Sequence, residues 1–105
     1  VDATDVKDII NAAGNADIIV NGLPIQFNLN VMEAALETGA CYQDLCMTYI
    51  EGKTFQQATR FIFDEQGKKF KEKGLLALTN TGSAPGLNNV IVREAVEMTD
   101  SCDRI

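Results

Sequence analysis

The residues with the clearest chemical potential form a loop of small side chains, TGSAPG, at positions 81–86. The loop follows a short apolar run, LLAL, and precedes an amphipathic run that begins at Leu87. Gly82 and Gly86 would let the backbone approach a ligand closely, and the free N–H groups at the start of a helix attract negative or polar groups. The pattern is typical of a loop that binds a small ligand. An ordinary strand-to-helix turn with a serine cap is the alternative.

Two further loops carry polar or sulfur-containing side chains after apolar runs. In NGLP (21–24), Asn21 and the backbone of Gly22 could contact a ribose or a pyrophosphate, although a simple strand-ending turn is the alternative. In DLCM (44–47), Asp44 and Cys46 could act as acid–base or substrate-contacting groups. The alternatives here are a turn-forming aspartate and a cysteine that packs as a small hydrophobic residue.

Composition argues against several classes of site and partner. The 105 residues contain no histidine, which excludes serine–histidine and cysteine–histidine catalysis within them. The three cysteines lack a CxxC spacing, which argues against a structural metal site and favours a reducing, cytoplasmic location. The net charge of -6 argues against nucleic acid and anionic membranes as partners. No apolar run approaches the ~20 residues that a membrane-spanning helix needs.

Helices and strands alternate in the predicted element order. Apolar spacing predicts a helix after Thr4 or Asp5 that ends at Gly14, and a second helix capped by Asn28 that ends at Gly39. A third helix is expected over 55–73 and a fourth with Pro85 in its first turn and its apolar side chains facing inward. The predicted strands are 16–23, 40–45 and 75–80.

The alternation of strands and helices predicts an α/β fold with a parallel sheet. The run 16–23 is nearly all apolar, which is typical of a strand buried on both faces of such a sheet. Ligands bind at the carboxyl ends of parallel strands. We therefore expect the loops 21–24, 44–47 and 81–86 to open on one edge of the sheet.

Five segments in order carry a family resemblance: VDATD, ADIIVNGLP, VMEAALETGACYQDL, KKFKEKGLLAL and GSAPGLNNV. Together they resemble the saccharopine dehydrogenase-like oxidoreductases, a group that includes saccharopine reductase and carboxynorspermidine dehydrogenase. The resemblance runs from Val1 to about Ile105. Its most specific part is the last, a strand followed by G-x-x-P-G-L-x-N at the start of a helix.

The resemblance implies the second half of a Rossmann-type doubly wound parallel sheet. The domain is incomplete in these residues, because the family's glycine-rich G-x-G-x-x-G turn is absent from them. Residues 1–99 would be the C-terminal portion of an NAD(P)-binding domain, and residues 100–105 would begin the segment that leads to a catalytic and dimerisation domain.

The implied activity is that of an NAD(P)-dependent oxidoreductase acting on CH–NH bonds. Such an enzyme condenses an amine reductively with an aldehyde or keto acid, or catalyses the reverse reaction. The resemblance implies NADP or NAD as cofactor, an amine or amino-acid substrate from amino-acid or polyamine metabolism, and a homo-oligomer. A half sheet alone leaves an exposed strand edge, so we expect the 105 residues by themselves to associate and to bind dinucleotide poorly.

Matching residue by residue to the family's motifs implies two sets of site residues. The cofactor set is Asp2, Ala3, Asn21, Gly22, Leu23, Pro24, Leu45, Ser83, Ala84 and Pro85. The substrate set is Cys46, Met47 and Ser83. The matching identifies no catalytic residue and no metal ligand.

Two positions depart from the family pattern. Ala84 stands where many relatives carry aspartate, and Cys46 and Met47 stand where many saccharopine reductases carry serine and tyrosine. The segment GACYQDL is closer to the carboxynorspermidine type. Two alternative functions stay open: a non-catalytic interaction module of the same fold, for which Ala84 is the motive, and a small nucleotide-binding domain.

Overall fold

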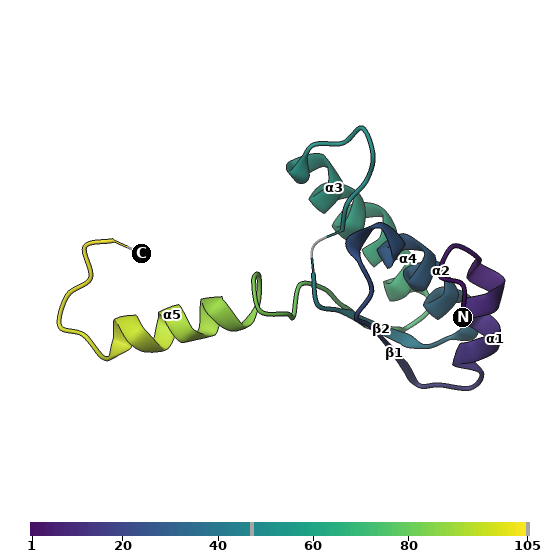
Figure 1. Cartoon of the computed structure of the whole chain (residues 1–105), viewed down its shortest axis with the longest axis horizontal. Coiled ribbons are helices and arrows are strands. Elements are labelled where there is room, and N and C mark those ends of the chain that lie inside the picture. Colours follow the sequence, from purple (N-terminus) through teal and green to yellow (C-terminus); the bar gives the residue numbers. More distant parts are fainter. Residues whose placement is uncertain (47, 105) are drawn as a thin grey trace.

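A computed structural model describes residues 1–46 and 48–104 (Figure 1). Its centre is a three-stranded sheet with the order β1-β2-β3 and only parallel pairs. The strands are β1 (Ile18–Asn21), β2 (Cys41–Asp44) and β3 (Ala77–Leu78). All three are shorter than the predicted runs, but their order and direction confirm the predicted α/β class.

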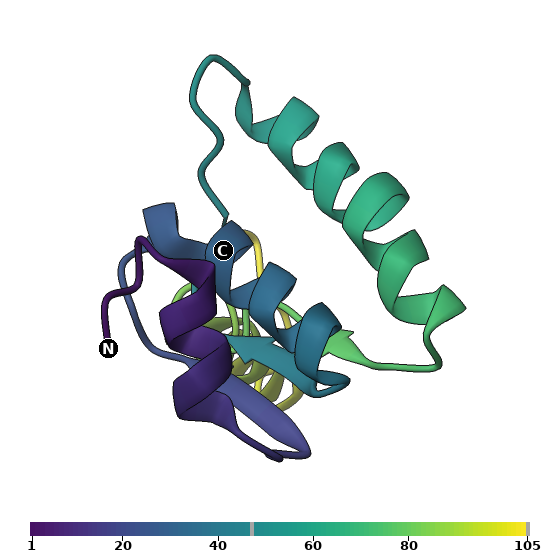
Figure 2. The ribbon, with the colours of Figure 1, turned by 90° about the vertical axis from the view of Figure 1, so that its right-hand side faces the viewer.

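Helices precede, separate and follow the strands. They are α1 (Val6–Ala13), α2 (Asn28–Thr38), α3 (Phe55–Phe61), α4 (Gly67–Glu72) and α5 (Leu87–Glu97), with a 3₁₀ turn η1 (Ile25–Phe27) before α2 and a π-helical turn η2 (Ile62–Gln66) between α3 and α4. Figure 2 shows α3, η2 and α4 as one continuous rod. The rod confirms the predicted helix over 55–73, and Gly67 lies where the π-helical turn ends.

The helix ends follow the capping signals in most places. Asp5 caps α1 through a hydrogen bond from the Lys7 N–H to its carboxylate (2.9 Å), and Gly14 ends the helix. Two predictions were wrong in detail. Asn28 is not the cap of α2 but its first residue, because η1 leads directly into the helix. Pro85 precedes α5 rather than lying in its first turn, because Gly86 forms the cap.

The core lies on one face of the sheet. Alternate strand residues point to opposite faces, so Ile19, Tyr42 and Ala77 point toward the helices and pack in one apolar cluster. Ile9 from α1, Phe70 from α4 and the buried apolar side chains of α2 also belong to this cluster. Figure 2 shows α1, α2 and the α3–α4 rod together on this side of the sheet.

The opposite face of the sheet is open in the part of the chain that the structure describes. Ile18, Val20 and Leu78 are 50%, 58% and 48% exposed there. The expectation that the run 16–23 is buried on both faces was therefore wrong. The reason is the course of α5, which extends away from the sheet instead of covering it (Figure 1) and gives the molecule a long dimension of 52 Å.

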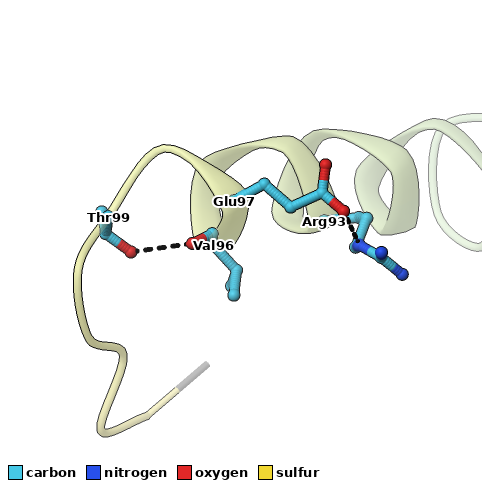
Figure 3. Close-up of polar contacts among 4 residues, drawn as sticks. All are labelled: Arg93, Val96, Glu97 and Thr99. Carbon is cyan, nitrogen blue, oxygen red and sulfur yellow. Dashed lines mark hydrogen bonds and ion pairs between the residues drawn. The ribbon is translucent and has the colours of Figure 1, made fainter.

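Helix α5 exposes apolar side chains to solvent. Val90 and Met98 are 59% and 84% exposed, so the prediction that its apolar side chains face inward was also wrong. Local polar contacts support its C-terminal turn: Arg93 pairs with Glu97, and the Thr99 hydroxyl donates to the carbonyl of Val96 at 3.0 Å (Figure 3). Two apolar surfaces, the open sheet face and α5, are thus exposed to solvent.

The open sheet face generates a prediction about association. We expect the 105-residue chain to self-associate, and Val20→Lys to weaken this association by about tenfold, because a lysine replaces one of the exposed apolar side chains of this face. Sedimentation equilibrium measures the effect. Phe63→Lys is the matched control, since Phe63 is 66% exposed but belongs to the π-helical turn. An equal effect of both variants would contradict the assignment to the sheet.

Candidate functional site

The loops that follow the three strands meet at one edge, as predicted. The backbone N–H and the hydroxyl of Thr81 both donate to the carbonyl of Asp44, at 3.1 and 2.7 Å. The thiol of Cys46 lies 4.0 Å from the carbonyl of Leu23. Gly22 lies beside the side chain of Leu45, since a Cβ built on Gly22 would be 3.9 Å from a Leu45 methyl carbon. We call this meeting of the loops 21–24, 44–46 and 79–86 the rim.

The carboxylate of Asp44 lies beneath the rim and is fully buried. One oxygen accepts from the backbone N–H of Asn80 at 2.7 Å, and the other accepts from the Tyr42 hydroxyl at 3.0 Å. The side-chain amide of Asn28 donates to the second oxygen at 3.4 Å. Asp44 therefore joins β2, α2 and the loop after β3, and it points into the protein rather than into the site.

Burial raises the pKa values of both Asp44 and Tyr42. Removal from water raises the pKa of the Asp44 carboxyl above its ordinary value, and hydrogen bonds from Asn80, Tyr42 and Cys46 partly oppose that rise. Burial also raises the pKa of the Tyr42 hydroxyl well above its ordinary value. Tyr42 therefore keeps its proton and donates it in the hydrogen bond to Asp44.

Asn21, a predicted cofactor residue, holds the first loop from below. Its amide nitrogen donates to the side-chain oxygen of Asn28 at 2.8 Å and to the Tyr42 hydroxyl at 3.3 Å, while its own oxygen accepts from the Leu23 N–H at 3.0 Å. The side chain is buried and its polar atoms are used within the protein. Gly22, Leu23 and Pro24 are the exposed part of this loop.

Asn28 is the residue of the site that sequence reasoning missed. Its amide nitrogen also donates to the carbonyl of Cys46 at 3.0 Å and to the Thr48 hydroxyl at 3.3 Å, so it connects the first two loops. A signal was present: Asn28 precedes Val31, Met32 and Ala35 on the inward stripe of α2 at helical spacing. A polar residue on an apolar stripe needs buried partners.

A cavity of about 330 Å³ opens between the N-terminal segment and the first loop. Its lining includes Ala3, Asn21, Gly22 and Leu23, which brings together four members of the predicted cofactor set. The remaining lining residues are apolar: Val1, Ile9, Ile19, Val20 and Val31. With no charged side chain in the lining, the cavity suits a flat apolar ring better than a phosphate.

Asp2 lies outside this cavity lining and is exposed. Its carboxylate accepts from the backbone N–H of Thr4 at 2.9 Å and from the Thr4 hydroxyl at 2.7 Å. These hydrogen bonds lower the pKa of Asp2. The side chain thus shapes the turn that leads into α1.

The glycines of the loop 81–86 are required by the packing of the backbone. A Cβ on Gly82 would lie 1.9 Å from the carbonyl oxygen of Leu45, and a Cβ on Gly86 would lie 2.2 Å from the carbonyl oxygen of Gly82. Gly86 also has φ 131°, which favours glycine. No side chain caps α5, so the alternative of a serine-capped turn does not hold for Ser83. Ser83, Ala84 and Pro85 form the exposed tip of the loop.

Of the predicted substrate residues, Cys46 lies in the second loop of the rim and Ser83 at the exposed tip of the third. Cys46 is half-buried and lies beside Leu23. Leu45 is 42% exposed and lies beside Gly82. Met47 falls outside the described residues. Within residues 1–46 and 48–104 there is no cluster of metal-ligating side chains, and none of the helices has the length and apolar character to cross a membrane.

Residues 1–78 match the family model described as the saccharopine dehydrogenase NADP binding domain. The matched stretch includes all three strands, the first two loops of the rim, and the N-terminal segment that lines the cavity. It ends before the loop 81–86.

The raised pKa of Asp44 generates a prediction about pH and stability. The folded chain holds this proton more tightly than the unfolded chain, so the stabilisation is greatest below the unfolded pKa of about 3.9 and falls as pH rises through the raised value. In Asp44→Asn the group no longer titrates. The unfolding free energy of the wild type minus that of the variant should therefore become less positive as pH rises from 4 to 7 in urea titrations. A difference independent of pH would contradict this.

The crowding around Gly82 generates a second prediction. Gly82→Ala should lower the unfolding free energy by about 2–4 kcal/mol, because the new methyl group overlaps the Leu45 carbonyl and must displace a loop. Gly22→Ala is the control, since its Cβ would lie 3.9 Å from a Leu45 methyl group, in ordinary contact. It should cost less than about 1 kcal/mol. Urea unfolding compares the two, and similar costs would show that the rim does not depend on Gly82.

Proposed function

The chain belongs to the saccharopine dehydrogenase family through its NADP binding domain, and from this we propose that its protein oxidises and reduces carbon–nitrogen bonds with NAD(P). In the proposed reaction an amine is joined reductively to an aldehyde or keto acid, or a secondary amine is oxidised. The observation that carries the proposal is the rim, where loops from all three parallel strands meet at the carboxyl edge. Dinucleotides bind at this edge of doubly wound sheets.

The residues present fit one part of the cofactor. Ala3, Gly22 and Leu23 would hold the adenosine part, since they line an apolar cavity in which Gly22 has no side chain to exclude a ligand. Leu45 and the tip 83–85 would lie toward the nicotinamide. The cofactor, when bound, supplies the hydride chemistry.

The pyrophosphate needs a partner that the cavity does not offer. The cavity lining carries no positive charge, and G-x-G-x-x-G does not occur in the 105 residues. We propose that residues 1–99 form the C-terminal portion of the nucleotide-binding domain and that a glycine-rich turn outside these residues binds the pyrophosphate. Residues 100–105 would begin the segment that leads to a catalytic and dimerisation domain.

The proposed contribution of these residues is positioning. The titratable groups beneath the rim, Asp44 and Tyr42, are buried and hydrogen-bonded to the protein, so they hold the loops in place. We propose that the side chains of Cys46 and Ser83, in the second and third loops of the rim, contact the substrate. An iminium formed from an amine and a carbonyl is already activated toward hydride, which reduces the need for a general acid.

Two further properties belong to this proposal. The open apolar face of the sheet supports a homo-oligomer or a larger domain in which that face is covered. The three unpaired thiols of Cys41, Cys46 and Cys102 support a reducing, cytoplasmic location.

The test uses the intact polypeptide that contains these 105 residues. We expect NADPH or NADH to be consumed with amine and carbonyl pairs, and calorimetry to show nucleotide binding. Gly22→Val should weaken nucleotide binding by about tenfold, because its side chain enters the cofactor cavity. Gly67→Ala in α4 is the matched control and should leave binding unchanged.

A polypeptide that binds no nucleotide would contradict the proposal and favour the non-catalytic interaction module. Ala84, at the exposed tip of the third loop, is the feature that motivates that second candidate.

A further inference from the structure

A small cavity of about 20 Å³ lies between α3, the π-helical turn η2 and the loop after β3. Thr48, Thr59, Thr79 and Asn80 supply the polar atoms of its lining, and Ala58 is one of its apolar residues. None of the described lining residues is charged. The volume suits a single water, which needs roughly 10–15 Å³ of such space.

The side-chain oxygen of Asn80 is buried and accepts no hydrogen bond within residues 1–46 and 48–104. Both nitrogen atoms of this residue have partners: the backbone N–H donates to the Asp44 carboxylate at 2.7 Å, and the side-chain nitrogen donates to the Thr79 hydroxyl at 3.5 Å. Buried polar atoms in native proteins are paired with protein or with ordered water. An unpaired oxygen at a polar cavity therefore indicates a ligand.

Two threonine hydroxyls can complete a site around this oxygen. The Thr48 hydroxyl accepts from the Asn28 amide at 3.3 Å, and in the described part of the chain it donates to no other group, so its proton is available. The Thr59 hydroxyl donates to the Phe55 carbonyl at 2.9 Å, and its lone pairs can still accept. Asn80 and these hydroxyls thus offer three polar partners, as many as a buried water commonly uses.

We propose that this cavity binds one ordered water, which donates to Asn80 Oδ1 and bonds to the Thr48 and Thr59 hydroxyls. A neutral ligand fits better than an ion, because the lining offers no opposite charge. The water would also support the left-handed backbone of Asn80, whose φ is 63°.

Such a water would couple the α3–α4 rod to the rim. Thr59 belongs to α3, whereas Asn80 donates to the buried carboxylate of Asp44 beneath the rim. The inference concerns how the loops are held and does not depend on the proposed function.

A crystal structure of the intact polypeptide that contains these 105 residues tests the site directly. At a resolution that shows ordered solvent, we expect one water within hydrogen-bonding distance of Asn80 Oδ1 and of at least one of the two hydroxyls. A cavity without a water, or Asn80 Oδ1 bonded to a protein donor, would overturn the inference.

Ala58→Val tests the effect of the water in solution. Ala58 is buried and lines the cavity, so the two added methyl groups should displace the water and leave Asn80 Oδ1 unpaired. Hydrogen exchange of the Asn80 N–H, measured by mass spectrometry on peptides that contain it, should then accelerate by about tenfold.

Ala58→Ser is the matched control, because its hydroxyl can bond to the water or take its place. It should change exchange at Asn80 by less than about twofold. Peptides from α1, which does not line this cavity, should exchange at the wild-type rate in both variants. No acceleration in Ala58→Val, or equal acceleration in both variants, would contradict the link between the water and Asn80.

Discussion

The buried carboxylate of Asp44 is the interaction on which the rim depends. A buried carboxylate is stable only when hydrogen bonds replace the water that it has lost. Here the donors are the Asn80 N–H from the loop after β3, the Tyr42 hydroxyl from the middle of β2 and the Asn28 amide from α2. One side chain at the end of the central strand thereby fixes the position of the neighbouring loop. Removing the carboxylate would leave the buried Tyr42 hydroxyl and the partly buried Asn80 N–H without this acceptor.

In this network the buried polar side chains hold the loops in place, and the loop backbones form the surface that a ligand would meet. Asn21, Asn28 and Asp44 are buried and satisfy one another and the loop backbones from below. The surface above them consists of small or apolar groups, with Gly22 and the tip 83–85 at its edges. Such a surface offers shape and close backbone approach rather than reactive groups. It suits a domain whose cofactor supplies the chemistry and whose protein supplies position.

The two faces of the sheet differ in a way that bears on the whole protein. One face packs against α1, α2 and the α3–α4 rod in a single apolar cluster. The other face exposes Ile18, Val20 and Leu78, and α5 presents further apolar side chains to solvent. Parallel sheets are stable when both faces are covered. The proposed larger nucleotide-binding domain accounts for this asymmetry, because its remaining elements would supply the cover.

The sequence by itself determined the elements, their order and the edge at which the loops meet. Caps and glycines act within one turn of chain, so Asp5, Gly14 and Gly39 marked helix ends correctly, and alternation of strands and helices sufficed for a parallel sheet. Only the tertiary structure decided that Asp44 and Asn28 are buried beneath the site and that one sheet face stays open. Those features depend on partners far apart in the chain, such as Asp44 with Asn80, and on the direction in which α5 leaves the sheet. Local periodicity indicates that Asn28 faces inward, but it identifies neither the distant partners of Asn28 and Asp44 nor the direction of α5.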